Sequence, residues 1–249
     1  MAFTVKTACG CFIGNGREHN EDNFYFNKKH LPKINKGLKT PIYFETTTQE
    51  PEVLAIFDGM GGEAHGEEAA CKACEVFAEE VKRDAELVVQ GKEYLYTTCH
   101  RANKVVADTT GGTTVAAIYI WQDEVYACNV GDSRIFRIRD NQMLQISQDH
   151  TDEKILTAMG IQKKPVLLQY LGVPDTEMVI EPFISKGEIQ TGDIYVICSD
   201  GVTDYLAVHE LYEVIKKADD VKRAVETVLR RVDENNGLDN ATIIIAKLM

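Results

Sequence analysis

Residues 53–70 read VLAIFDGMGGEAHGEEAA, a stretch that joins an apolar run, an acid, a run of glycines and a helical pattern. The apolar run at 53–57 predicts a strand, and the spacing after residue 66 is typical of a helix. Asp58 therefore lies where the strand ends, and Gly59 leaves the backbone open directly after it. A carboxylate beside an unobstructed carbonyl offers hard oxygen ligands to Mg²⁺ or Mn²⁺. This stretch predicts a cation site at a strand end.

The same stretch also permits a dinucleotide site, because residues 59–64 scan as GxGxxA between a strand and a helix. In such a site, amide N–H groups and a helix N-terminus face a pyrophosphate. Asp58 would place a negative charge against that anion. The repulsion favours the cation over the dinucleotide.

The composition limits the partners of the chain. Its 249 residues are 44% hydrophobic, enough for a large core, and carry a net charge of -12. A charge of this sign repels nucleic acid and anionic membranes, so we expect neither as a partner. The N-terminal residues lack the pattern of a signal peptide, and no apolar run approaches the roughly 20 residues that span a bilayer. We expect a soluble protein of the cytoplasm.

The seven cysteines have no disulfide-scaffold spacing, which is consistent with a reducing compartment. Cys71 and Cys74 resemble half of a zinc site in CKAC, but no second half accompanies them. Cys74 falls on the apolar helical stripe of Ala70, Phe77 and Val81, so we interpret it as a core residue.

The chain carries no repeat, low-complexity tract or linker, and we predict one domain over residues 1–249. Residues 28–50 are basic, then threonine-rich, and read as an exposed excursion between two strands or as a hairpin. Residues 160–175 form a second irregular piece.

Many short strands follow one another through turns, which indicates largely antiparallel sheets, and helices occur in pairs. The fold predicted is an α+β sandwich with helices outside the sheets. Strands are predicted at 3–13, 23–27, 53–57, 113–121, 124–130, 133–139, 143–146, 178–184, 193–198 and 241–247. Helices are predicted at 67–83, before 107, and at 152–159, 209–217 and 219–234, the last capped by Asp219 or Asp220.

Further acids follow or precede apolar runs beside Gly, Ser or Asn. They are Glu21, Asp22, Asp132, Asp200, Asp204 and Asp239. Each alone is also compatible with ordinary turn chemistry. If their strand ends converge with that of Asp58, the acids repel one another unless cations lie among them. Together they predict a two-metal site that activates water.

Other site types fit less well. DENNGLDNATII, from Asp233, resembles a calcium loop, but its glycine falls one position early and Ile244 replaces the bidentate glutamate. The sequence contains no P-loop, no GxSxG motif and no recognisable cysteine nucleophile.

The ordered motifs REHNEDNF, FDGMGG, GGTTVAA, NVGDSRIF, SDGVTDYL and DNATIII resemble those of the PPM family, the metal-dependent type 2C-like serine/threonine protein phosphatases, especially the bacterial members. The resemblance extends over almost all of residues 1–249. It implies a four-layer αββα sandwich with a binuclear Mn²⁺ or Mg²⁺ centre that hydrolyses phosphoserine and phosphothreonine. It also implies phosphorylated proteins as substrates and a serine/threonine kinase that acts on the same proteins, and we expect a monomer.

Carried over by motif, the resemblance gives roles to single residues. It implies that Asp58 bridges two metals, that the Gly59 carbonyl and the carboxylates of Asp200 and Asp239 complete the ligands, and that Arg17 grips the phosphate. The remaining metal-associated residues are Glu21 and Asp22, which ligate or hold metal-bound waters, and Asp132, which recruits a weaker third metal.

Met60 departs from the family, because many eukaryotic members have histidine there as a candidate general acid. The segment at 160–175 lies where relatives carry a flap, and it is short. Two alternatives stay open: a non-catalytic binding module of the same fold, and a metal phosphohydrolase for small phosphate esters. Degenerate members usually lose a ligating acid, whereas Asp58, Asp200 and Asp239 are all present.

Overall fold

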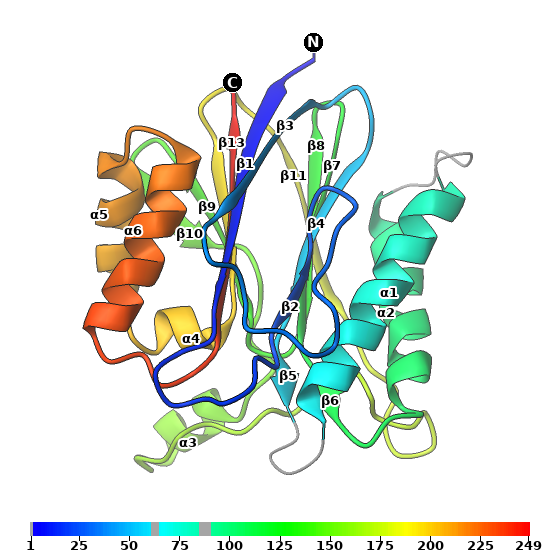
Figure 1. Cartoon of the computed structure of the whole chain (residues 1–249). Helices are drawn as coiled ribbons and strands as arrows, with labels where there is room; N and C mark the ends of the chain where they lie inside the picture. Colours follow the sequence, from blue (N-terminus) through cyan, green and yellow to red (C-terminus); the bar gives the residue numbers. More distant parts are fainter. Residues whose placement is uncertain (1, 61–64, 85–90) are drawn as a thin grey trace.

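The computed structural model describes residues 2–60, 65–84 and 91–249 (Figure 1). Residues 61–64, the second half of the glycine run, lie outside these ranges. No helix within the described ranges has the length and apolar character that a membrane crossing needs.

Two antiparallel sheets face each other through the middle of the molecule (Figure 1). Sheet A has the order β10-β9-β12-β13-β1-β3, and sheet B the order β11-β8-β7-β4-β2. The strands of sheet A are β10 (Gln142–Gln145), β9 (Arg134–Arg139), β12 (Ile194–Cys198), β13 (Ala241–Leu248), β1 (Thr4–Phe12) and β3 (Ile42–Thr47). Those of sheet B are β11 (Phe183–Glu188), β8 (Glu124–Val130), β7 (Val115–Trp121), β4 (Glu52–Phe57) and β2 (Asn23–Tyr25). A short ribbon of β5 (Gly59–Met60) and β6 (Gly112–Thr113) lies at one end.

Helices cover the outer face of each sheet, giving four layers (Figure 1). On sheet B lie α1 (Gly66–Asp84) and α2 (Gly91–Val106). On sheet A lie α4 (Asp200–Thr203), α5 (Val208–Lys217) and α6 (Val221–Glu234), and α3 (Glu153–Ala158) lies apart near the end that carries β5 and β6. The predicted fold class, an α+β sandwich with helices outside antiparallel sheets, is confirmed.

β13 shows why its sequence is an almost unbroken apolar run. Ile244 and Ala246 pack between the two sheets, whereas Ile243 and Ile245 face the helices on sheet A. A strand with both faces buried has no position for polar residues, so the alternation of a half-exposed strand is lost. β13 is accordingly a central strand, paired with β12 on one side and β1 on the other.

α6 begins and packs as its sequence predicts. The side chain of Asp220 accepts a hydrogen bond of 2.8 Å from the backbone N–H of Arg223, which identifies Asp220 as the cap. Gly10 on β1 lets the helix approach closely, because a Cβ there would lie 2.6 Å from side-chain atoms of Val225 and Leu229. Cys74 is fully buried in the core between α1 and sheet B, as predicted.

One predicted strand is wrong at its start, and one irregular segment contains a strand. The strand predicted at 178–184 is observed as β11, which begins at Phe183 directly after Pro182. Proline donates no hydrogen bond to a ladder, so the pairing with β8 starts only after it. The excursion at 28–50 contains β3, which pairs with β1 at the edge of sheet A and alternates between half-buried and exposed residues.

We expect Ile244→Ala to lower the free energy of unfolding by about 2–5 kcal/mol, because it opens a cavity between two packed sheets. Val179→Ala is the control, since Val179 is 61% exposed, and should change stability by less than about 0.5 kcal/mol. Urea unfolding followed by tryptophan fluorescence and circular dichroism measures both. Equal effects of the two substitutions would contradict the central position of β13.

Candidate metal centre

The predicted acids lie at the ends of strands from both sheets. Asp22 precedes β2, Asp58 follows β4, Asp132 follows β8, Asp200 follows β12 and Asp239 precedes β13. Their charges act on one another. Those of Asp22, Asp132 and Asp200 raise the pKa of Asp58, and those of Asp200 and Asp239 raise the pKa of Asp22. The structure thus brings together aspartates that are separated by up to 217 positions in the chain.

Asp58 is the centre of this cluster. Burial, and then the charges of Asp22, Asp200 and Asp132, raise its pKa well above the usual range, and its carboxyl is hydrogen-bonded to that of Asp200. Its backbone is fixed by β6 and β7, since Thr113 Oγ1 and the N–H of Thr114 both donate to the Asp58 carbonyl at 2.9 Å. The GGTT motif therefore holds the end of β4 in place.

Asp22 is held more rigidly than its neighbours. Its Oδ2 accepts hydrogen bonds from Thr242 Oγ1 at 2.6 Å and from Ser199 Oγ at 2.9 Å, which tie β2 to β13 and β12. Its Oδ1 is buried and has no hydrogen-bond partner among the residues that the structure describes. Burial raises the pKa of Asp22 to about 7, although the two hydroxyl donors lower it. One oxygen is thus committed to the scaffold and the other is available.

Asp132 lies in the turn after β8, where Gly131 has a φ of 106° that favours glycine. Burial, and then the charge of Asp200, raise the pKa of Asp132 to about 7. Ser133 is buried, and its Oγ lies 2.7 Å from Thr114 Oγ1. This contact joins the turn to the strand that supports Asp58.

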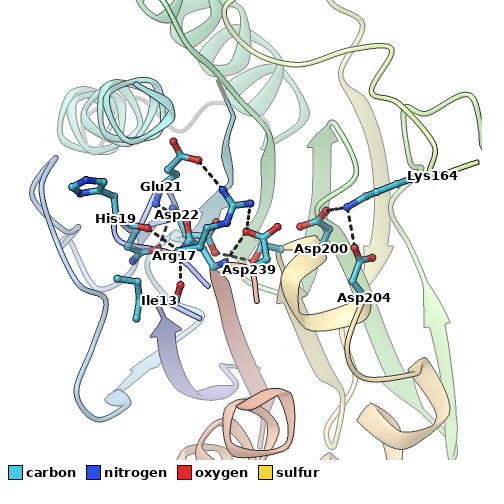
Figure 2. Close-up of polar contacts among 12 residues, drawn as sticks. Ile13, Arg17, His19, Glu21, Asp22, Lys164, Asp200, Asp204 and Asp239 are labelled. Atoms are coloured by element: carbon cyan, nitrogen blue, oxygen red, sulfur yellow. Dashed lines mark hydrogen bonds and ion pairs between the residues drawn. The ribbon is translucent and has the colours of Figure 1, made fainter. Parts of the chain in front are cut away.

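Arg17 stands between two acids of the cluster (Figure 2). Its Nη2 lies 2.7 Å from Asp239 Oδ1, and its Nη1 lies 3.8 Å from Glu21 Oε2. Glu21 is mostly buried beside the start of α1, and burial raises its pKa. Arg17, which is 43% exposed, therefore presents its guanidinium at the rim of the cluster.

Asn240 organises the loop that carries these residues, a role that the sequence motif did not reveal. Its Nδ2 donates to the carbonyl of Ile13 at 2.6 Å, and its Oδ1 accepts from the N–H of Glu21 at 2.8 Å. Gly201 packs against the same point, because a Cβ there would lie 1.9 Å from the Asn240 carbonyl oxygen. Asp200 and Asp239 are brought together by this close backbone contact.

Lys164 reaches the other side of the cluster from the segment at 160–175 (Figure 2). Its Nζ lies 3.2 Å from Asp204 Oδ2 and 3.8 Å from Asp200 Oδ2. No sequence pattern predicts this pair, since Lys164 is one of two adjacent lysines in an irregular segment. Lys164 thus brings a positive charge from residues 160–175 beside the carboxylate of Asp200.

The donor set fits hard divalent cations. Carboxylates from several strands converge, and burial raises the pKa values of Asp22, Asp58, Asp132 and Asp200. Asp22 Oδ1 is buried without a partner in the described ranges. Such a group of oxygens is stable in its ionised form only beside positive charge. Within the described residues, no three side chains are already arranged as a coordination sphere, because several oxygens face Arg17, Lys164, Ser199 or Thr242.

Gly59 fits tightly beside Asp58. A Cβ at this position would lie 2.3 Å from the Gly66 carbonyl oxygen and 2.5 Å from that of Glu21. Any side chain would therefore push apart β5, α1 and the loop before β2. Met60 follows it on β5, half-buried, and pairs with Gly112.

Comparison with protein families gives one match over most of the chain. A sequence model described as "Protein phosphatase 2C" matches residues 42–243. The chain is 28% identical to the serine/threonine phosphatase stp of Listeria innocua, over 94% of this chain and 92% of that protein. It is also 28% identical to the serine/threonine protein phosphatase PstP of Mycobacterium tuberculosis, over 89% of this chain and 45% of PstP.

Solved structures have the same fold. The catalytic domain of the phosphatase PstP, solved in complex with two manganese ions, superposes with a TM-score of 0.80 at 24% identity over the whole of both chains. The serine/threonine phosphatase Stp1 from Staphylococcus aureus gives a TM-score of 0.77 at 22% identity, over 98% of this chain and 94% of that one.

The raised pKa values predict how the metal-free protein responds to pH. Because the folded state binds protons that the unfolded state has lost, the contribution of these carboxyls to stability is greatest at low pH and is lost as pH rises through about 7. In EDTA, we expect the thermal midpoint to fall between pH 5.5 and 8. Asp58→Asn should raise the midpoint at pH 8 by about 2–4 °C, equivalent to about 1 kcal/mol.

Scanning fluorimetry with and without Mn²⁺ measures these midpoints. The control is Asp219→Asn, an exposed aspartate between α5 and α6, which should leave the pH dependence unchanged. Mn²⁺ should stabilise the parent and the control and should stabilise Asp58→Asn much less. A midpoint that rises with pH in EDTA would contradict the repulsion.

Proposed function

The chain belongs to the protein phosphatase 2C family, and we propose that it is a metal-dependent phosphatase that hydrolyses phosphoserine and phosphothreonine in proteins at the carboxylate cluster. The observation that carries this proposal is the convergence of Asp22, Asp58, Asp132, Asp200 and Asp239 from separate strand ends. A family member that acted only as a binding module would not need such repelling acids, all of them retained.

We propose two Mn²⁺ or Mg²⁺ ions at this cluster, held by Asp58, the Gly59 carbonyl, Asp200 and Asp239. When bound, the ions supply Lewis acidity toward the phosphate and lower the pKa of water so that hydroxide forms near neutral pH. Asp22 and Glu21 support this set from the buried side. Asp132, whose carboxyl is close enough to Asp200 for the two charges to interact, is the acid that we assign to a weaker third ion.

Arg17 is the residue that we assign to the phosphate. Its guanidinium lies at the exposed rim of the cluster, held there by Asp239 and Glu21. The planar fork of arginine can donate two parallel hydrogen bonds to phosphate oxygens and orient the ester. A positively charged group at this rim also draws the dianionic substrate toward a site surrounded by acids.

Several further features are proposals about the cellular setting. All seven cysteines are buried thiols in the structure, which supports a reducing cytoplasmic compartment. We propose that residues 1–249 act as one catalytic domain and as a monomer. We further propose that phosphoproteins produced by a serine/threonine kinase are the substrates.

An assay series tests the function. Phosphoserine and phosphothreonine peptides should be hydrolysed with Mn²⁺ or Mg²⁺, phosphotyrosine peptides much less, and EDTA should abolish turnover. Asp239→Asn should lower kcat/KM by at least about 100-fold through loss of a ligand charge, whereas the exposed Asp219→Asn should not. Release of phosphate, read with malachite green, gives the rates. Undiminished turnover in EDTA, or in Asp239→Asn at moderate Mn²⁺, would reject the proposal.

Arg17→Ala should separate substrate binding from chemistry. A guanidinium that holds phosphate in the ground state and the transition state alike contributes mainly to KM, so we expect KM to rise about tenfold with kcat within about threefold of the parent. Arg17→Lys should recover only part of the loss, since an ammonium lacks the fork. Calorimetry with Mn²⁺ gives the metal affinity of each variant. A fall in kcat at unchanged KM would assign Arg17 to the transition state alone.

A further inference from the structure

The sandwich has an open edge on the side of β10 and β11. These are the terminal strands of sheets A and B, and each is hydrogen-bonded to a neighbouring strand on one side only. The two edges are bridged by a hydrogen bond of 2.9 Å from Ser185 Oγ to the carbonyl of Ile146. The outer N–H and C=O groups of an edge strand are available to another extended segment.

Arg137 points into the space between the sheets at this edge. On β9, Ile135 faces the core between the sheets, whereas Phe136 and Ile138 face the helices, so the alternation places Arg137 on the inner face. Its cross-strand neighbours are Leu144 and Tyr195. A charged residue on the inner face of a sandwich is uncommon and needs a partner.

Arg137 has no such partner among the described residues. Within the described part of the chain, its buried Nε has no hydrogen bond and its guanidinium forms no ion pair. The other arginines whose side chains are described each pair with a carboxylate, in a chain that has 39 acidic and 27 basic residues. Among the arginines whose side chains the structure describes, Arg137 is thus the exception.

Two acids near this edge, Asp193 and Glu124, are already committed to other groups. Asp193 accepts from Arg139 Nε at 2.7 Å and Nη2 at 2.6 Å, and also from Tyr195 and the N–H of Gln190. Glu124 pairs with Lys186 and accepts from Tyr126. Since no described carboxylate forms an ion pair with Arg137, its guanidinium is free to pair with a carboxylate or phosphate of another molecule.

The space in front of Arg137 has room for side chains. A hollow of about 270 Å³ lies between the sheets, and one of about 430 Å³ continues along β9 and β10; both are lined by Arg137 and Leu144. The walls of the first are mainly apolar, formed by Val125, Ala127, Ile146, Phe183 and Tyr195. Leu144, which pairs with Arg137 across β9 and β10, is 56% exposed.

We propose that this edge binds an extended acidic segment of a partner protein. One carboxylate or phosphate of the segment pairs with Arg137, the apolar side chains two positions away pack on Leu144 and Phe183, and the backbone adds to an edge strand. None of the residues that line the two hollows belongs to the carboxylate cluster. The site goes beyond the proposed phosphatase activity and is independent of it.

The probe is a nine-residue peptide that alternates valine and glutamate, with a second peptide in which glutamine replaces each glutamate. Calorimetry gives affinities, and amide shifts in the ¹⁵N spectrum of the full chain locate the site. We expect the glutamate peptide to bind, to shift amides of β10 and β11, and to bind more weakly as salt rises. The glutamine peptide should bind at least about tenfold more weakly, the loss of one charge-assisted hydrogen bond.

Arg137→Met keeps the aliphatic stem and removes the charge, so it should weaken the glutamate peptide at least about tenfold. Arg223→Met is the matched control, since it removes the same charge from an exposed site on α6, and it should leave binding unchanged. Leu144→Ser tests the apolar wall and should weaken both peptides. Hydrolysis of p-nitrophenyl phosphate should stay at the parent rate in all three variants, which separates this site from the catalytic centre.

Three outcomes would overturn the proposal. The first is equal binding of the two peptides, or of the glutamate peptide to the parent and Arg137→Met. The second is that inorganic phosphate alone shifts the same amides and binds with the same affinity as the glutamate peptide. The site would then bind free anions and would not recognise an extended peptide segment. The third is self-association of Arg137→Met in sedimentation, with no peptide binding to the parent, since Arg137 would then only keep the edge from pairing with a second copy.

Discussion

Repulsion among the aspartates at one end of the sandwich is the constraint that the surrounding structure has to meet. Asp22, Asp58, Asp132 and Asp200 are each surrounded by other acids, and burial removes the water that would screen them. Folding brings these groups together because they sit at strand ends that the two sheets align. Positive charge has to be present nearby, and the chain itself supplies part of it through Arg17 and Lys164.

The scaffold holds this cluster through neutral hydrogen bonds between strands. Ser199, directly after β12, and Thr242 on β13 donate hydrogen bonds to one oxygen of Asp22. Asn240 accepts a hydrogen bond from the N–H of Glu21 and so holds the loop that carries it. Neutral donors position a carboxylate without cancelling its charge, so the acids remain able to hold cations. The close backbone contact between Gly201 and Asn240 serves the same purpose, because it leaves no freedom in the spacing of Asp200 and Asp239.

Local patterns predicted much of this arrangement, since each acid follows or precedes an apolar run that reads as a strand. The cap at Asp220 and the buried face of α6 also depend on neighbours within a few positions. Contacts between distant segments left no comparable signal. Lys164 contacts Asp204, 40 positions away in the chain, and Asn240 is hydrogen-bonded to Ile13, 227 positions away. The position of Arg137 on the inner face of sheet A follows only from how the two sheets pack. The start of β11 was missed because Pro182 interrupts a run with good strand character.

The place of β13 in sheet A has a consequence for synthesis on the ribosome. β10, β9 and β12 pair with one another, as do β1 and β3, and β13 is the strand that joins these two groups. It is also the last of the strands in chain order, and Asp239 immediately precedes it. A nascent chain can assemble sheet B early but holds sheet A as two separate pieces until residues 241–248 leave the exit tunnel. The complete set of acids therefore forms only after the rest of the domain has been made, so an unfinished chain cannot hold the full site.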